Sequence, residues 1–143
     1  MPIRPDDPYM NFNFSVEIEG IEAAGFMEVS GIIVETEVVE YRQGNMPGQP
    51  LKLPGQTRFG NITLKRGVSR SNTLWTWYQS VVQGDADRRS LSIILLNTRR
   101  EEVRRWNVYE AWPCKYETSQ LNAKGNEVLI ETLEVVCERI EVG

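Results

Sequence analysis

A strict two-residue alternation near the N-terminus constrains the fold most strongly. Between residues 12 and 19, apolar and polar side chains take turns: Phe12, Phe14, Val16 and Ile18 alternate with Asn13, Ser15, Glu17 and Glu19. Successive side chains of a β-strand point to opposite faces of the sheet, whereas a helix repeats every 3.6 residues. The pattern therefore predicts a strand with one buried and one solvated face.

Six further segments are rich in β-branched and aromatic residues, which favour strands. They are Phe26–Ser30, Ile32–Tyr41, Asn61–Gly67, Leu91–Asn97, Val103–Cys114 and Asn126–Val142. Gly31 separates the first two and predicts a bulge or a sharp bend there. The charged residues 98–102 predict a solvated hairpin turn.

One segment has helical periodicity. Between Thr73 and Gln83, apolar side chains recur at the spacing of one helix face: Leu74, Trp77, Tyr78, Val81 and Val82. Residues 69–72 offer candidate N-cap side chains, and Gly84 is placed to end the helix. Trp75 falls on the opposite face, where it either meets a neighbouring subunit or lies against a loop.

These elements predict a mainly β protein, an antiparallel barrel or sandwich with one flanking helix. The 143 residues lie within the size range of one domain, so we expect a single domain over 1–143.

The segment Arg42–Arg58 is rich in glycine and proline, which disfavour a helix or a central strand. We therefore expect a long exposed loop. It carries Met46, Leu51, Leu53 and Pro54, which are unusual in a linker, and this composition indicates a role in contacts with a partner.

The C-terminal segment Asn126–Val142 places apolar residues on both alternating faces, Val128 and Ile130 among them. A strand that is apolar on both sides is covered on both sides. Part of this surface is therefore expected to meet a partner.

The composition argues against most catalytic mechanisms. The chain has no histidine, which removes the usual acid–base group and imidazole metal ligands. No phosphate-binding motif is present, and the net charge of -4 disfavours nucleic-acid binding as the main task. Cys114 and Cys137 lack metal-ligand spacing and are expected to be buried free thiols. We expect no cofactor and no enzymatic activity.

Carboxylates are the remaining route to catalysis. Glu17 with Glu19, and Glu35 with Glu37, each place two carboxylates on one strand face about 6.5 to 7 Å apart. That spacing is close to the one glycosidases use. A solvated or channel-lining face explains such alternation more simply, and we favour it.

No apolar stretch approaches the roughly 20 residues that span a bilayer, and residues 1–11 lack an apolar signal core. We therefore expect the chain to begin in the cytoplasm and not to insert into a membrane by itself.

Several motifs, in order, resemble the tail-tube protein family of contractile phages and extracellular contractile injection systems. They are Phe12–Gly20, Ala24-Gly25-Phe26 with Val29-Ser30-Gly31, Leu53-Pro54-Gly55, Asn61–Gly67, Ala111-Trp112-Pro113 and Leu121-Asn122-Ala123 leading to 126–128. The resemblance implies a β-barrel-like structural subunit. It further implies hexameric rings that stack into a hollow tube inside a contractile sheath, growing from a baseplate hub or tube initiator and delivering DNA or protein.

Under this interpretation, Met46, Leu51, Leu53 and Pro54 reach an adjacent ring or protomer, and the segment with Val128 and Ile130 forms an edge contact. Glu17, Glu19, Glu35 and Glu37 are candidates for an acidic lumen that repels phosphates. The assembled particle is a phage tail or an injection device.

Two alternatives stay open. A related chain that initiates or terminates a tube, or a type VI secretion tube protein, has the same fold but forms a single ring. A small barrel binding an apolar ligand is a different class, in which Phe12, Phe14, Trp77 and Trp106 line a cavity. Self-association distinguishes the last class from the others.

Overall fold

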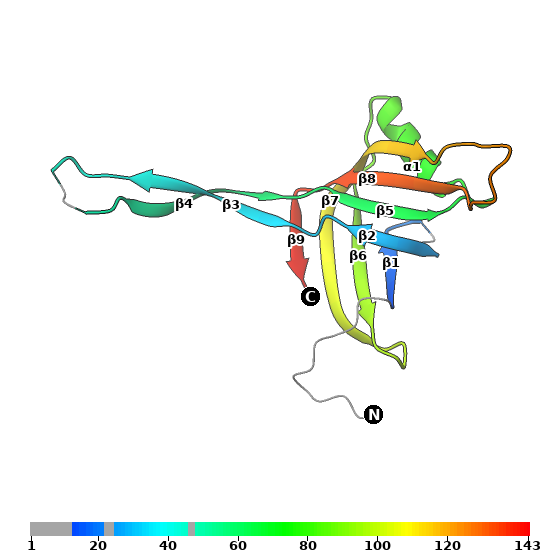
Figure 1. The fold of residues 1–143 in the computed structure, drawn as a ribbon, viewed down its shortest axis with the longest axis horizontal. Helices are drawn as coiled ribbons and strands as arrows, with labels where there is room; N and C mark the ends of the chain where they lie inside the picture. Colours follow the sequence, from blue (N-terminus) through cyan, green and yellow to red (C-terminus); the bar gives the residue numbers. More distant parts are fainter. Residues whose placement is uncertain (1–12, 22–24, 46–47) are drawn as a thin grey trace.

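The computed structural model describes residues 13–21, 25–45 and 48–143, and its fold is mainly antiparallel β-structure with one helix in this part of the chain (Figure 1). The elements are β1 (Phe14–Ile18), β2 (Phe26–Ser30), β3 (Val34–Tyr41), β4 (Leu51–Phe59), β5 (Ile62–Gly67), α1 (Thr73–Val82), β6 (Arg89–Leu96), β7 (Glu102–Thr118), β8 (Ile130–Val136) and β9 (Arg139–Val142). The predicted fold class is confirmed.

The long strand β7 joins two layers. Its first part, up to Ala111, pairs with β6, and its second part, from Trp112, pairs with β8. The strand order is β1-β6-β7-β8-β5-β2, and β9 pairs with β7. Near the end of the first part lies Glu110, a non-glycine residue with φ of 53°, at a register shift of the β6–β7 ladder. Such a bulge bends a strand, which lets β7 pass from one layer to the other (Figure 1).

The core lies between these layers because alternate strand residues point inward. Alternation in β5 buries Ile62 and Leu64, and alternation in β8 buries Leu133 and Val135. The opposing layer contributes core side chains from β1, β6 and β7: Val16, Ile18, Leu91, Ile93, Val108 and Ala111. Burying a side chain of the Val, Leu or Ile type stabilises the fold by about 1.5–3 kcal/mol.

Helix α1 completes the core where the sequence predicted it. Leu74 and Trp77 are buried on its inner face, and the Trp77 indole Nε1 donates a hydrogen bond to the Asp87 carbonyl oxygen at 2.6 Å. Asn72 is the N-cap residue, although its side chain makes no capping hydrogen bond. Gly84 follows the helix with φ of 86°, a conformation that glycine adopts readily.

Two expectations about element boundaries were wrong. The predicted loop Arg42–Arg58 is a strand from Leu51 onward, because β4 pairs with β3. A ribbon of two strands contains only edge strands, where a proline such as Pro54 is tolerated. The C-terminal segment is likewise not one strand: Val128 precedes β8, and a break after Val136 separates β8 from β9.

Candidate assembly interface

Strands β3 and β4 form a separate two-stranded ribbon, hereafter the arm, which projects from the two-layered body (Figure 1). Every residue of β3 is exposed, and so is every residue of β4 except Phe59 at the base. An isolated two-stranded hairpin is at best marginally stable in water because it has no core to cover. The arm therefore has the properties of an element that is stabilised by a partner.

The register divides the outer part of the arm into two chemically different faces. Val39 pairs with Leu53 and Tyr41 with Leu51, so these four side chains share one face. Their exposed fractions lie between 43% and 48%. The opposite face carries the cross-strand pairs Glu40–Lys52 and Val38–Pro54, and Val38 is 62% exposed. The outer arm thus presents a wholly apolar face backed by a mixed one.

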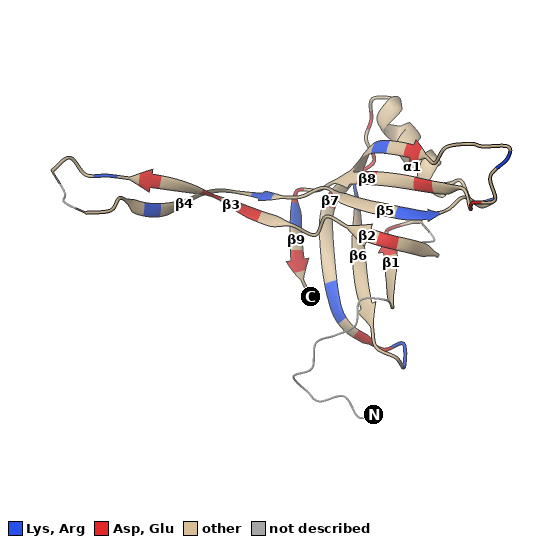
Figure 2. Ribbon diagram, viewed as in Figure 1, with Lys and Arg blue, Asp and Glu red and all other residues tan. Residues whose placement is uncertain are grey.

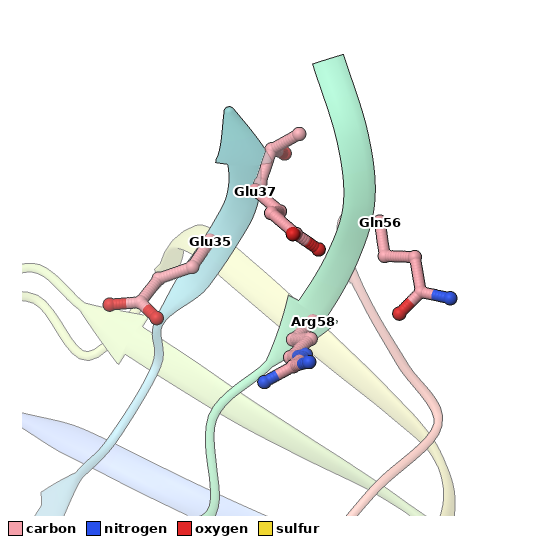
Figure 3. A pocket seen from close by; sticks show the side chains of 5 residues that line it. Glu35, Glu37, Gln56 and Arg58 are labelled. Carbon is pink, nitrogen blue, oxygen red and sulfur yellow. The ribbon is translucent and has the colours of Figure 1, made fainter. Parts of the chain in front are cut away.

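The inner part of the arm is polar on the corresponding face. Glu35, Glu37, Gln56 and Arg58 line a shallow surface depression, with the two glutamates on β3 and the other two residues on β4 (Figure 3). Glu35 lies opposite Arg58 in the register, and a register shift follows Thr36. All four side chains are exposed to solvent.

Two glycines, Gly31 and Gly60, lie where the arm meets the body. Gly31 separates β2 from β3 and has φ of 93°, and a Cβ added there would lie 1.9 Å from the Asn61 carbonyl oxygen. Between β4 and β5, the Gly60 amide donates a hydrogen bond to the Ile33 carbonyl oxygen at 2.8 Å. Only glycine fits this close approach of two backbones, so the predicted break at Gly31 is confirmed.

The other carboxylate pair lies elsewhere. Glu17 on β1 forms an ion pair with Arg105 at 3.6 Å, and the Glu19 carboxylate accepts a hydrogen bond from the Ser90 amide at 3.1 Å. The structure does not bring this pair together with Glu35 and Glu37, which lie on the arm. Across the described residues, no group of His, Cys, Asp or Glu is arranged to hold a metal ion.

Several strands of the body have an unpaired edge within the described residues. β1 pairs with β6 alone, β2 with β5 alone, and β9 with β7 alone. Unpaired edges offer backbone N–H and C=O groups to another chain. Both layers can therefore be extended by neighbouring subunits.

The two predicted contact residues near the C-terminus lie in different environments. Val128 is 73% exposed in the loop over residues 119–129, hereafter the β7–β8 loop, whereas Ile130 begins β8 and is half-buried. The same loop exposes Leu121 by 78%. Sequence reasoning missed Leu121 because a single apolar residue in a polar loop has no periodic signal.

A buried charged network was also missed. The Arg66 Nε donates to Glu131 Oε1 at 2.5 Å, and both side chains are almost fully buried between β5 and β8. The Tyr116 hydroxyl donates to Glu131 Oε2 at 2.6 Å. Burial, together with this carboxylate, raises the pKa of Tyr116. Arg66 and Glu131 share the alternation phase of core residues in their strands, which is the signal that could have revealed the pair.

The aromatic residues on α1 meet the body beside this network. Trp75 is 42% exposed, but its ring stacks on Tyr78 and meets the edge of Tyr116 at a centroid distance of 5.2 Å. The sequence left open whether Trp75 meets a neighbouring subunit or packs within its own. Packing within the subunit covers part of the Trp75 surface.

Both cysteines are free thiols and are half-buried. Burial, assisted by a contact with the Glu134 carboxylate, raises the pKa of Cys114 to about 11. Burial also raises the pKa of Cys137. The expectation of free thiols is confirmed, with less burial than anticipated.

The arm, the open sheet edges and the single flanking helix define a β-rich subunit built for assembly, and comparison with known proteins specifies it further. The family described as "T4-like virus tail tube protein gp19" matches residues 10–141. The chain belongs to this family, and it is a structural tube subunit of the contractile-injection type. A search of curated proteins found no match.

Solved structures agree with this assignment. A chain from the sheath–tube complex of an extracellular contractile injection system, PVC, in the extended state is 28% identical. The alignment covers 97% of this chain and 93% of that one, with a TM-score of 0.87. A chain from the tube-terminating cap of the anti-feeding prophage is 27% identical over 100% and 95%, also with a TM-score of 0.87. Hcp1 from Flavobacterium johnsoniae shares the fold at 19% identity, with coverage of 92% and 95% and a TM-score of 0.61.

Proposed function

We propose that this chain, acting as one domain over 1–143, forms hexameric rings that stack into a hollow tube inside a contractile sheath. The observation that carries the proposal is the arm, whose apolar outer face has no cover within the described subunit. The unpaired edges of β1, β2 and β9 support lateral closure of a ring, because a closed sheet satisfies the backbone groups of its edges.

The partners follow from the settings of the similar structures. Those structures come from a sheath–tube complex, a tube-terminating cap and a baseplate. We accordingly propose three kinds of partner for this chain. They are a sheath protein outside the tube, a baseplate hub or initiator at one end of the tube, and a terminator at the other end. The subunit assembles in the bacterial cytoplasm and then becomes part of a phage tail or injection particle.

The tube acts as a conduit for DNA or protein cargo, and the subunit performs no catalysis. The proposed lumen-facing residues are Glu17, Glu19, Glu35 and Glu37, all exposed in the isolated subunit. A negative wall repels phosphate groups and lets DNA move without sticking. In the described part of the chain, no helix has the length and apolarity to cross a bilayer.

The proposed contact residues on the arm are Leu51, Leu53 and Pro54, and Val128 and Ile130 supply a second contact. Met46 belongs to the same prediction but lies outside the described residues. The double change Leu51→Asp/Leu53→Asp is expected to abolish stacking, because charged side chains resist burial at an interface. The circular dichroism spectrum should not change, since both side chains are exposed.

The matched control is Leu51→Met/Leu53→Met, which keeps the surface apolar and should still stack in electron micrographs. Stacking that survives the aspartate change would remove this face of the arm from the interface.

A single-ring initiator or terminator is the second candidate, and the similarity to the terminating-cap chain favours it specifically. The ligand-binding barrel has less support. Trp77 is buried, and Phe14 and Trp106 pack against the core, so these aromatic side chains serve packing. Phe12 lies outside the described residues.

A further inference from the structure

The arm and the β7–β8 loop lie at opposite ends of the long axis of the molecule (Figure 1). The loop over residues 119–129 carries Leu121 and Val128, the two most exposed large apolar side chains among the described residues. The outer arm carries the apolar face formed by Val39, Tyr41, Leu51 and Leu53. One subunit therefore presents apolar surfaces at both ends.

The β7–β8 loop surrounds a surface hollow that is lined by its own residues, with Leu121 and Val128 on its wall. Polar groups of Ser119, Asn122 and Asn126 also line it. The apolar face of a strand pair can dock in such surroundings, because it covers Leu121 and Val128 while polar groups border the contact.

Internal hydrogen bonds hold the loop in this shape. The Ser119 amide donates to the Ile130 carbonyl oxygen at 2.8 Å, and the Ile130 amide donates to Ser119 Oγ at 2.9 Å. At its turn, the Gly125 and Lys124 amides donate to the carbonyl and side-chain oxygens of Asn122 at 3.0 and 3.1 Å. A hollow that is already formed loses little conformational entropy when it is filled.

The surroundings of both surfaces are charged in a compatible way. The arm places Glu40 opposite Lys52 behind its apolar face, and the loop carries Lys124 and Glu127, all exposed (Figure 2). Both signs of charge therefore lie near the apolar residues of each surface. Because Glu40 and Lys52 lie on the opposite face of the arm, they stay in solvent when its apolar face docks, and no like-charged groups are forced together.

We propose that the apolar face of the outer arm docks in the hollow of the β7–β8 loop of a second copy of this chain, joining copies head to tail. The proposal rests on the proposed tube function and specifies which surface receives the arm. Different surfaces at opposite ends make the contact heterologous, and heterologous contacts extend into rings or open stacks. Stacked rings require a contact of this type.

Disulfide trapping tests the contact directly. The double variant Leu53→Cys/Leu121→Cys is assembled, exposed to a mild oxidant and separated on a non-reducing gel. A ladder of cross-linked multimers is expected, at least tenfold more abundant than with the control pair Leu53→Cys/Val82→Cys. Val82 is 68% exposed on α1 and does not belong to the loop. The parent chain, with its two native thiols, sets the background.

Three results would count against the proposal. Normal tubes without a ladder from the 53/121 pair would overturn the docking contact and leave the tube function intact. A ladder from the 53/82 pair as abundant as that from the 53/121 pair would show that the cross-links arise from random collisions. That result would also overturn the docking contact and leave the tube function intact. A parent chain that forms neither rings nor tubes would overturn both the tube function and the contact.

A second variant avoids cysteine chemistry. Leu121→Asp/Val128→Asp alters exposed positions, so the fold should persist, but stacking should fail as it does for the arm variant. Unchanged stacking in this variant would contradict the proposal independently of the cross-linking result.

Discussion

Arg66 and Glu131 stand at strand positions that alternation assigns to the core, and each is the other's charged partner there. The Arg66 guanidinium also lies over the Phe26 ring at 5.6 Å and contacts the Thr73 hydroxyl at 3.4 Å. The pair therefore links β2, β5 and β8 to the start of α1. Removing one member leaves a buried charge without compensation.

Replacement of Glu131 by Leu is expected to lower the free energy of unfolding by about 3–5 kcal/mol. The double change Arg66→Met/Glu131→Leu should cost less, because it leaves no unpaired charge. The control is Glu28→Ala, which removes the exposed ion pair with Lys65 and should cost less than about 1 kcal/mol. Urea denaturation measures all three. A Glu131→Leu loss as small as that of Glu28→Ala would show that the pair is not important for stability.

The Cys114 thiol should react slowly with alkylating reagents. Its pKa of about 11, against an ordinary value of 9.0, leaves about 100-fold less thiolate near pH 8, and the thiolate is the reactive form. Peptide mapping of iodoacetamide adducts in the folded and the urea-unfolded chain, measured on a Cys137→Ala background, tests this. Equal rates in both states would contradict the raised pKa.

At the scale of elements, the arm is the part of the subunit that depends most on its neighbours. Trypsin sites lie at Arg42, Lys52 and Arg58, all in or next to the exposed ribbon. In the unassembled chain these sites should be cut first, whereas the buried Arg66 should resist. After assembly the arm should be protected. Mass spectrometry of the fragments measures the rate of cleavage at each site. Equal cleavage of the arm before and after assembly would contradict its role in the interface.

The sequence predicted those elements whose pattern reflects burial inside the subunit. Strands β1 and β5 and helix α1 each pack one face on the core, so their periodicity was readable. Strand β3 of the arm was predicted, but strand β4 was misread as a loop, because the arm packs on nothing within the subunit. Its strands therefore follow no burial pattern, and Pro54 and Gly55 looked like loop residues. Similarly, the charge of Arg66 and Glu131 concealed their inward orientation, since a single sequence does not show that two charges meet.

For the whole molecule, the arrangement of surfaces is more informative than any single site. The two layers form a closed core, whereas the arm, the β7–β8 loop and the edges of β1, β2 and β9 face outward without cover in the described residues. Among the described residues, the predicted interface positions fall in two groups, on the arm and in the region of the β7–β8 loop, and these two elements lie at opposite ends of the long axis (Figure 1). This polarity is what a repeating, directional assembly requires.

Electron microscopy of the purified chain over a range of concentrations, with light scattering on the same samples, shows whether the chain assembles as proposed. We expect sixfold rings that stack into hollow tubes as the concentration rises, because intersubunit contacts form by mass action. A chain that stays monomeric at every concentration, with its arm as sensitive to protease as at high dilution, would contradict it.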